Sequence, residues 1–228
     1  MDEEGPLKAG ELIVEGFRRL LKPPFLSLLV LNLFVSSVAA SFAGQIDEIS
    51  VFSSVALAVV SAYLQIAVIL AASDQEPVES ADHWIKAAVK RRCFWRFALA
   101  SIFSFILVAA GLLALVIPGF IVGAYVGMGP IAAVVERTRA GDSLRRSVEL
   151  SVKGRRAVGV IFGLFVVIPN GALQVALYFA PKALPLGLWI GLELATVILF
   201  LVALIALTRA FVCLGGRLEP LPAKRASA

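Results

Sequence analysis

The stretch that decides the fold of this chain covers residues 51–72 and reads VFSSVALAVVSAYLQIAVILAA, without a charged side chain. An apolar run of about 20 residues, at 1.5 Å of rise per residue, can cross the ~30 Å hydrocarbon core of a bilayer as an α-helix. Inside lipid, the backbone of such a run can satisfy its hydrogen bonds only within the helix itself. The stretch therefore predicts a transmembrane helix.

Five further segments have the same apolar character. The six expected spans are 24–44, 51–72, 97–117, 119–136, 157–180 and 186–211. The connections at 45–50, 118–119 and 181–185 are short, so each is expected to close a helical hairpin. Hydrophobic residues make up 60% of the chain and the mean hydropathy is +0.92, which excludes a soluble globular protein. We expect one all-α transmembrane domain over 1–228, a polytopic membrane protein folded as a six-span helical bundle.

The distribution of lysine and arginine predicts the orientation of these spans. Every basic residue except Lys182 falls on one side of the six segments, and the positive-inside rule places that side in the cytoplasm. Both termini, including a short tail at 212–228, are therefore expected in the cytoplasm. A five-span chain in which segment 119–136 does not cross would put basic clusters on opposite sides, and we reject it for that reason.

Each expected hairpin is preceded by a short amphipathic segment that carries basic residues. The three predicted helices cover 8–22, 80–95 and 142–155, and their apolar residues recur at helical spacing. In the third helix, the apolar stripe consists of Leu144, Val148 and Val152. Helices of this kind are suited to lie in the plane of the lipid headgroups on the cytoplasmic side. Ser80 and Asp142 are the expected N-caps of the second and third helices.

The net charge of +5 indicates a lipid partner rather than nucleic acid, because the basic residues lie at the ends of apolar runs. Five basic residues around the third apolar stripe are expected to contact the phosphates of anionic lipids: Arg145, Arg146, Lys153, Arg155 and Arg156. Each contributes about 1 kcal/mol near an anionic surface. Glu136 is expected to pair with an arginine one or two turns on or to cap the helix. A homo-oligomer or a membrane protein partner stays open.

Glu193 lies inside the last expected span, among apolar residues. A charge at the centre of a span costs roughly 2.5–3.5 kcal/mol, so this side chain is expected to face the bundle interior. Gln174 and Asn170 of the preceding span fall at a similar depth, which predicts a polar cluster of the three. The cluster could serve a transporter as a proton-titrating or cation site, or it could be a neutral carboxyl that holds helices together. The lack of a basic partner within the spans favours the structural interpretation.

Further features of the spans predict helix packing. Asn32 and Gln65 fall at similar depths in the first hairpin and are expected to form a hydrogen-bonded pair. Gly119, Gly123 and Gly127 repeat at four-residue spacing, which opens a flat face for close approach of another helix. That helix is expected to belong to the same chain, with a second copy as the alternative. Pro130 is expected to kink the fourth span.

The sequence shows no constellation of catalytic residues. His83 is the only histidine, and the chain contains neither a phosphate-binding glycine loop nor the ligand spacing of a zinc site. Cys93 and Cys213 both fall at expected cytoplasmic ends of spans, where thiols stay reduced. We expect no enzyme activity, no cofactor, no metal site and no disulfide.

The order of features from Pro118 to Gly163 resembles a group of prokaryotic membrane protein families. A glycine-rich span and Pro130 are followed by Glu136, by GDSLRRS at 141–147 and by KGRR at 153–156. This order is similar to the YciC-like proteins and to the membrane domain attached to some glycerophosphodiester phosphodiesterases. The resemblance implies a multi-pass protein of the cytoplasmic membrane of a prokaryote with an undefined biochemical role. It does not imply phosphodiesterase activity, which belongs to a separate soluble domain.

Three functions follow as hypotheses from these features. The first is a non-catalytic envelope component, acting as scaffold, assembly partner or membrane-homeostasis factor, which the many basic residues on the expected cytoplasmic side favour. The second is a small-solute or ion transporter or channel that uses the cluster around Glu193. The third is a lipid-interacting or lipid-moving protein, which the phosphate-seeking third helix favours.

Overall fold

The computed structural model describes residues 8–42, 48–74, 80–114, 116–169 and 186–218, and all regular structure in these ranges is helical. In chain order, these ranges contain α1 (Ala9–Leu20), α2 (Phe25–Phe42), α3 (Glu48–Ser73), α4 (Ala81–Arg91), α5 (Phe94–Ala114), α6 (Val116–Val126), α7 (Gly129–Val135), α8 (Ala140–Phe162), the π-helical turn η1 (Gly163–Val167) and α10 (Leu186–Cys213).

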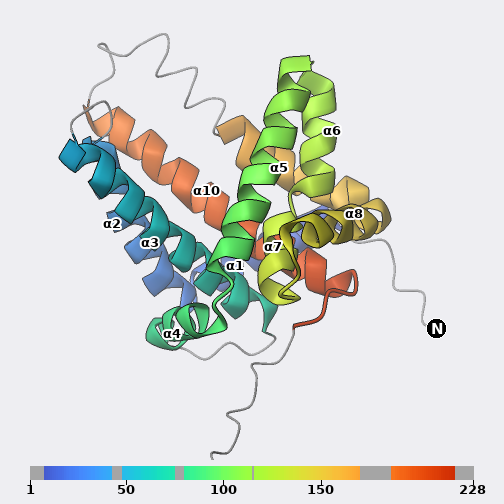
Figure 1. Ribbon diagram of the computed structural model, residues 1–228, viewed down its shortest axis with the longest axis horizontal. Helices are drawn as coiled ribbons and strands as arrows, with labels where there is room; N and C mark the ends of the chain where they lie inside the picture. Colours follow the sequence, from blue (N-terminus) through green and yellow to red (C-terminus); the bar gives the residue numbers. More distant parts are fainter. Residues whose placement is uncertain (1–7, 43–47, 75–79, 115, 170–185, 219–228) are drawn as a thin grey trace, which may run out of the picture.

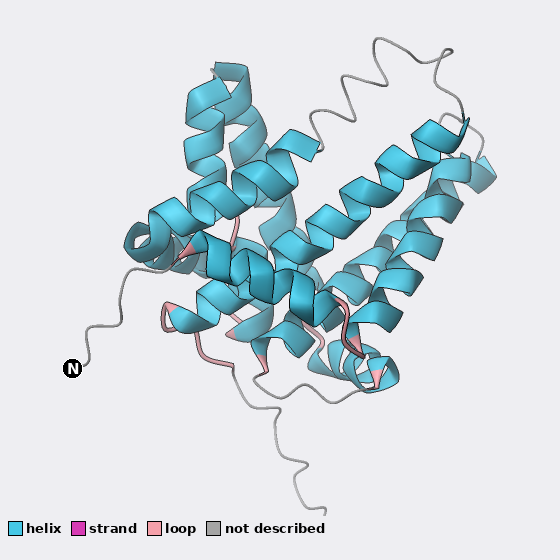
Figure 2. Ribbon diagram, turned by 180° about the vertical axis from the view of Figure 1, so that it is seen from behind, coloured by secondary structure: helices cyan, strands magenta, loops and turns pink. Residues whose placement is uncertain are grey.

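The long helices form two arms that share a common base (Figures 1 and 2). One arm contains α2, α3 and α10 packed side by side, and the other is the α5–α6 hairpin. The arms diverge away from the base, where α1, α4, α7 and α8 lie. The core is concentrated where the helices converge: it includes 66–72 of α3, 131–135 of α7 and 201–207 of α10, all of which are buried. The base is therefore the well-packed part of the protein.

Among the described residues, three helices are long and apolar enough to cross a membrane. They are Val51–Ser73, Phe94–Gly111 and Gly191–Cys213, which correspond to the second, third and sixth expected spans. A fourth is present if the bent pair Ala9–Leu20 and Phe25–Ala39 counts as one span; its two parts meet at 82°. The structure thus shows an all-helical protein with three or four candidate spans, and the six-span count stays a prediction.

The fourth and fifth expected spans account for much of the difference between this count and the six that we expected. The apolar stretch Gly119–Val135 is short, and it is broken at Gly127 and Met128 between α6 and α7. The fifth span begins within α8 and η1, but its second half lies outside the described residues. The break before Pro130 fits the expected kink, because proline lacks the N–H that a continuous helix would need there.

The turn of the second hairpin differs from our prediction. We expected it at Pro118 and Gly119, but α5 ends at Ala114 and α6 has already begun at Val116. Both Pro118 and Gly119 therefore lie in the first turns of α6. Proline is well tolerated there, since the first N–H groups of a helix have no intrahelical partner.

The first two predicted amphipathic segments contain the helices α1 and α4, and α1 packs across α10. The backbone of α1 comes close to α10 at Gly16, where an added Cβ would lie 3.1 Å from the carbonyl oxygen of Val202. Glu15 reinforces the crossing, since its Oε1 accepts from Arg19 Nε at 2.9 Å and from Arg209 Nε at 3.0 Å. Leu12 is buried at this crossing, so part of the stripe that we expected to face lipid faces protein instead.

The expected N-caps are not used as predicted. Ser80 occupies the N-cap position of α4, but its side chain makes no capping hydrogen bond. Asp142 lies in the first turn of α8, whose N-cap is Arg139. The carboxylate of Asp142 still carries a charge of the favourable sign for the positive end of the helix dipole.

Candidate functional site

The break between α6 and α7 leaves backbone carbonyls that need donors, and buried serines supply them. The N–H of residue 130 would bond the Val126 carbonyl in a continuous helix, but Pro130 has none. Ser104 Oγ of α5 donates to that carbonyl at 3.2 Å. The neighbouring Tyr125 carbonyl accepts from two serines of α8, Ser147 Oγ at 2.7 Å and Ser151 Oγ at 3.3 Å. Serine hydroxyls thus stabilise the broken helix.

These contacts decide which face of α8 is buried. Ser143, Ser147 and Ser151 recur at four-residue spacing and all three are fully buried. Val148 and Val152, from the apolar stripe that we expected to anchor the helix, are exposed. The face of α8 that packs against the protein is therefore the serine face. The valine face points away from it.

The two serines that share the Tyr125 carbonyl should be redundant one at a time. We expect Ser147→Ala or Ser151→Ala alone to lower the free energy of unfolding by about 0.5 kcal/mol, because the other hydroxyl still donates. The double variant leaves a buried carbonyl unsatisfied and should cost about 1–3 kcal/mol. Ser143→Ala is the control, since Ser143 Oγ donates to Ala140 in its own helix. Strictly additive losses in denaturant titrations would contradict the shared contact.

Glycines in and just after α6 pack against an aromatic ring of α8, and a glycine after α8 packs against an aromatic ring of α6. A Cβ added at Gly123 would lie 2.2 Å from Cε1 of Phe162, and one added at Gly127 would lie 3.0 Å from Cδ2 of the same ring. In return, a Cβ at Gly163 would lie 2.3 Å from Cζ of Phe120. Each ring fills the space that the opposite glycine leaves. The partner of Gly123 and Gly127 is thus a helix of the same chain, as expected; Gly119 is buried.

The exposed face of α8 carries four of the five basic residues that we expected to contact lipid. Arg145 is 83% exposed, and Lys153, Arg155 and Arg156 are also exposed. The exposed residues Val148 and Val152 lie among them, with Val152 at 59%. The helix bends at Gly154, whose φ and ψ are −117° and 22°, between the amphipathic part and the expected fifth span. We call Arg145, Val148, Val152, Lys153, Arg155 and Arg156 the basic face.

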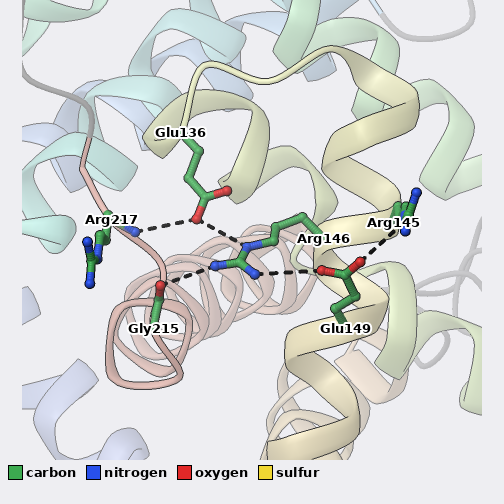
Figure 3. A network of polar contacts seen from close by, with 6 residues as sticks. All are labelled: Glu136, Arg145, Arg146, Glu149, Gly215 and Arg217. Atoms are coloured by element: carbon green, nitrogen blue, oxygen red, sulfur yellow. Dashed lines mark hydrogen bonds and ion pairs between the residues drawn. The ribbon is translucent and has the colours of Figure 1, made fainter.

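Arg146, the fifth of these residues, has a structural role instead (Figure 3). Its Nε contacts Glu136 Oε1 at 3.3 Å, its Nη2 donates to the Gly215 carbonyl at 3.2 Å, and its Nη1 lies 3.6 Å from Glu149 Oε2. The backbone N–H of Arg217 also donates to Glu136 at 3.4 Å. Arg146 therefore joins α8 to the segment after α10. Glu136 does pair with an arginine, but this partner is ten residues on, further than the one or two turns that we expected.

An open groove of about 650 Å³ lies beside the basic face, between α6 and the second half of α8 with η1. Its walls are apolar and include Phe120 and Ile121 on one side and Val160 and Leu164 on the other. Among the described residues that line it, Arg155 and Arg156 are the only charged ones. The site thus combines an apolar groove with two guanidinium groups.

Other predicted polar residues have different partners or cannot be placed. Asn32 Nδ2 donates to the Leu28 carbonyl at 2.9 Å, and Gln65 Nε2 donates to Ser61 Oγ at 3.4 Å. Each amide bonds within its own helix, in place of the predicted bond between them. Glu193 is half-buried in α10. Its expected partners Gln174 and Asn170 lie outside the described residues.

A buried arginine at the base was not anticipated. Arg91 is 3% exposed, and its Nη1 donates to the carbonyls of Val134 at 2.8 Å and Val135 at 3.5 Å, at the end of α7. Burial raises the pKa of the nearby Cys93 thiol, while the positive charge of Arg91 opposes this shift. Cys93 and Cys213 are both free, the first buried and the second exposed. The last carbonyls of a helix have no partner within the helix, so a donor such as Arg91 could have been expected at the end of α7.

The resemblance to the YciC-like group stays a prediction. No family model matches the chain, and no curated protein and no solved structure matches it either.

Proposed function

We propose that this chain is a six-span membrane protein, with both termini in the cytoplasm, that binds anionic phospholipid through the basic face of α8. It acts by holding lipid rather than by catalysis. The observation that carries the proposal is the division of α8 into a buried serine face and an exposed face with two valines and four cations. Glu149 also lies on the exposed face, where it pairs with Arg145 at 3.2 Å. The proposal selects the lipid-interacting hypothesis among the three that the sequence raises.

The composition of the basic face fits a membrane surface better than water. Val148 and Val152 can enter the boundary between headgroups and acyl chains, while the long side chains of Arg145 and Arg156 reach the phosphates. Four basic residues at about 1 kcal/mol each amount to roughly 4 kcal/mol of attraction to an anionic leaflet. The transport hypothesis rests on Glu193, Gln174 and Asn170, and the last two lie outside the described part of the chain.

Removing the charges of the basic face should remove the preference for anionic lipid. We expect the variant with Arg145→Gln, Lys153→Gln, Arg155→Gln and Arg156→Gln to retain at least about tenfold less phosphatidylglycerol relative to phosphatidylcholine, a loss of at least about 1.4 kcal/mol. The protein is purified in mild detergent from mixed vesicles, and the bound lipid is quantified by mass spectrometry.

A control variant removes the same charge elsewhere on the expected cytoplasmic side: Lys8→Gln, Arg18→Gln, Lys86→Gln and Lys90→Gln. All four residues are exposed, at or beside α1 and α4. Because the proposal assigns lipid retention to the basic face of α8, this variant should keep much more phosphatidylglycerol than the α8 variant. Equal losses in the two variants would show that only net charge matters. An unchanged ratio in both would contradict the proposed function.

A further inference from the structure

The groove between α6 and α8 has the dimensions of a lipid chain. It extends along α8 and η1 from Arg155 to Ile168, which is about 20 Å at 1.5 Å per residue. Half of a ~30 Å hydrocarbon core is about 15 Å, so an acyl chain of one leaflet fits within this length. The volume of about 650 Å³ is also sufficient for one chain.

Small residues create the groove. Gly159 lines its floor, and a Cβ added there would lie 3.7 Å from the Cβ of Ala124 on the opposite helix. Because neither residue has a larger side chain, the helices approach closely at the floor while their larger neighbours form the rims. Ile121 and Val160 are two such neighbours, and both are exposed to the surroundings. An exposed apolar groove of this kind is favourable only when lipid or protein covers it.

The charges identify the occupant. Arg155 and Arg156 follow the bend at Gly154, so they stand where the expected fifth span meets the cytoplasmic membrane surface. A guanidinium group binds a phosphate through parallel N–H···O bonds, and two adjacent ones favour an anionic headgroup. Below them the lining is apolar. A groove with cationic residues at one end and an apolar lining along its length is complementary to a molecule with a phosphate at one end and a hydrocarbon chain at the other.

We infer that the groove is a binding site for one anionic phospholipid, whose phosphate contacts Arg155 and Arg156 and whose acyl chain lies between α6 and α8. The inference deepens the proposed function and rests on it. It assigns different roles to residues of the basic face: Arg155 and Arg156 hold an individual lipid, while Arg145 and Lys153 contribute general attraction to the leaflet.

Two pairs of variants with matched chemistry test the site. The first pair compares Arg155→Gln/Arg156→Gln with Arg145→Gln/Lys153→Gln, both of which remove two charges from α8. The second compares Val160→Trp, which fills the groove, with Val152→Trp, which adds the same side chain on an exposed position outside it. Native mass spectrometry of the full-length protein with phosphatidylglycerol counts the bound lipids, and thermal unfolding of each variant in detergent identifies any that fails to fold.

Arg155→Gln/Arg156→Gln and Val160→Trp should each lose one tightly bound phosphatidylglycerol, with about tenfold weaker binding. Val152→Trp should keep this molecule. Arg145→Gln/Lys153→Gln should also keep it, while losing part of the loosely associated anionic lipid. Val160→Trp makes the test independent of charge and of the tolerance of the arginines to replacement. If the two charge variants lose lipid equally and Val160→Trp keeps it, the groove site is overturned while attraction to the leaflet stands. If no variant changes the bound lipid, both the groove site and the proposed function fail.

Discussion

Replacing Gly123 with valine should destabilise the protein by about 1–3 kcal/mol, the usual cost of forcing extra methyl groups into a packed interface. Even a single Cβ at this position would lie 2.2 Å from Cε1 of Phe162, so the ring must leave its place against α6. The same ring also touches Gly127, which leaves it little room to turn in that direction. The expected result is a lower free energy of unfolding, measured by denaturant titration in mixed micelles.

A second substitution can show that the ring is the cause. Phe162→Leu shortens the opposing side chain, so the combination with Gly123→Val should cost less than the sum of the two single changes by at least about 0.5 kcal/mol. Gly191→Val is the control on another candidate span, because among the described residues no atom outside the neighbouring backbone lies within 4 Å of the added Cβ there. Additive costs, or a similar loss at Gly191, would contradict the packing of the Phe162 ring against Gly123.

Replacing Arg91 with methionine should cost about 1.5–3 kcal/mol, the range for hydrogen bonds made by a charged group. The change removes the donors to the Val134 and Val135 carbonyls, which end α7 within the buried base. It also removes a positive charge from the negative end of a helix dipole. Thermal and denaturant unfolding in detergent should both report the loss.

Arg91→Lys separates charge from geometry at this site. Lysine keeps the positive charge but lacks the planar fork of donors, so it should recover only part of the lost stability. Lys90→Met is the neighbouring control, because Lys90 is exposed and its loss should change stability by no more than about 0.5 kcal/mol. Equal effects at positions 90 and 91 would show that the carbonyl contacts of Arg91 do not stabilise the base.

The helices could be predicted from the sequence because lipid leaves an apolar run of span length a single backbone conformation. Segments 51–72 and 186–211 match α3 and α10 closely for this reason. The turn between α5 and α6 could not be placed, because the Pro118-Gly119 pair is compatible both with a turn and with the start of a helix. The number of spans depends partly on residues outside the described ranges and stays a prediction.

The candidate site was predictable in its charges but not in its packing. Hydropathy predicted the side of α8 that faces lipid, and Val148 and Val152 are exposed as that prediction requires. It did not predict the side that faces the protein, where serine hydroxyls donate to the Tyr125 carbonyl of the neighbouring helix. The spacing of Ser143, Ser147 and Ser151 was a usable signal that hydropathy does not weigh. Similarly, matching depth alone could not establish the Asn32–Gln65 pair, because a polar side chain can bond within its own helix.

The groove could not be found from the sequence, because it depends on how closely α6 and α8 approach. Glycine spacing indicates that a close contact exists, but the register between the two helices decides which residues form walls and which are buried. Phe120 and Phe162 fix that register by filling the spaces at Gly163 and Gly123. Only this register shows that the two guanidinium groups lie beside an apolar groove.

The headgroup composition of the lipid that stays on the wild-type protein tests the central claim most directly. The protein is extracted in mild detergent from a membrane of known mixed charge, and the retained lipid is compared with the bulk membrane by mass spectrometry. Binding at the basic face and groove predicts retained lipid enriched in anionic phospholipid, with at least one such molecule per chain surviving purification. Retained lipid with the same composition as the bulk membrane would contradict the account.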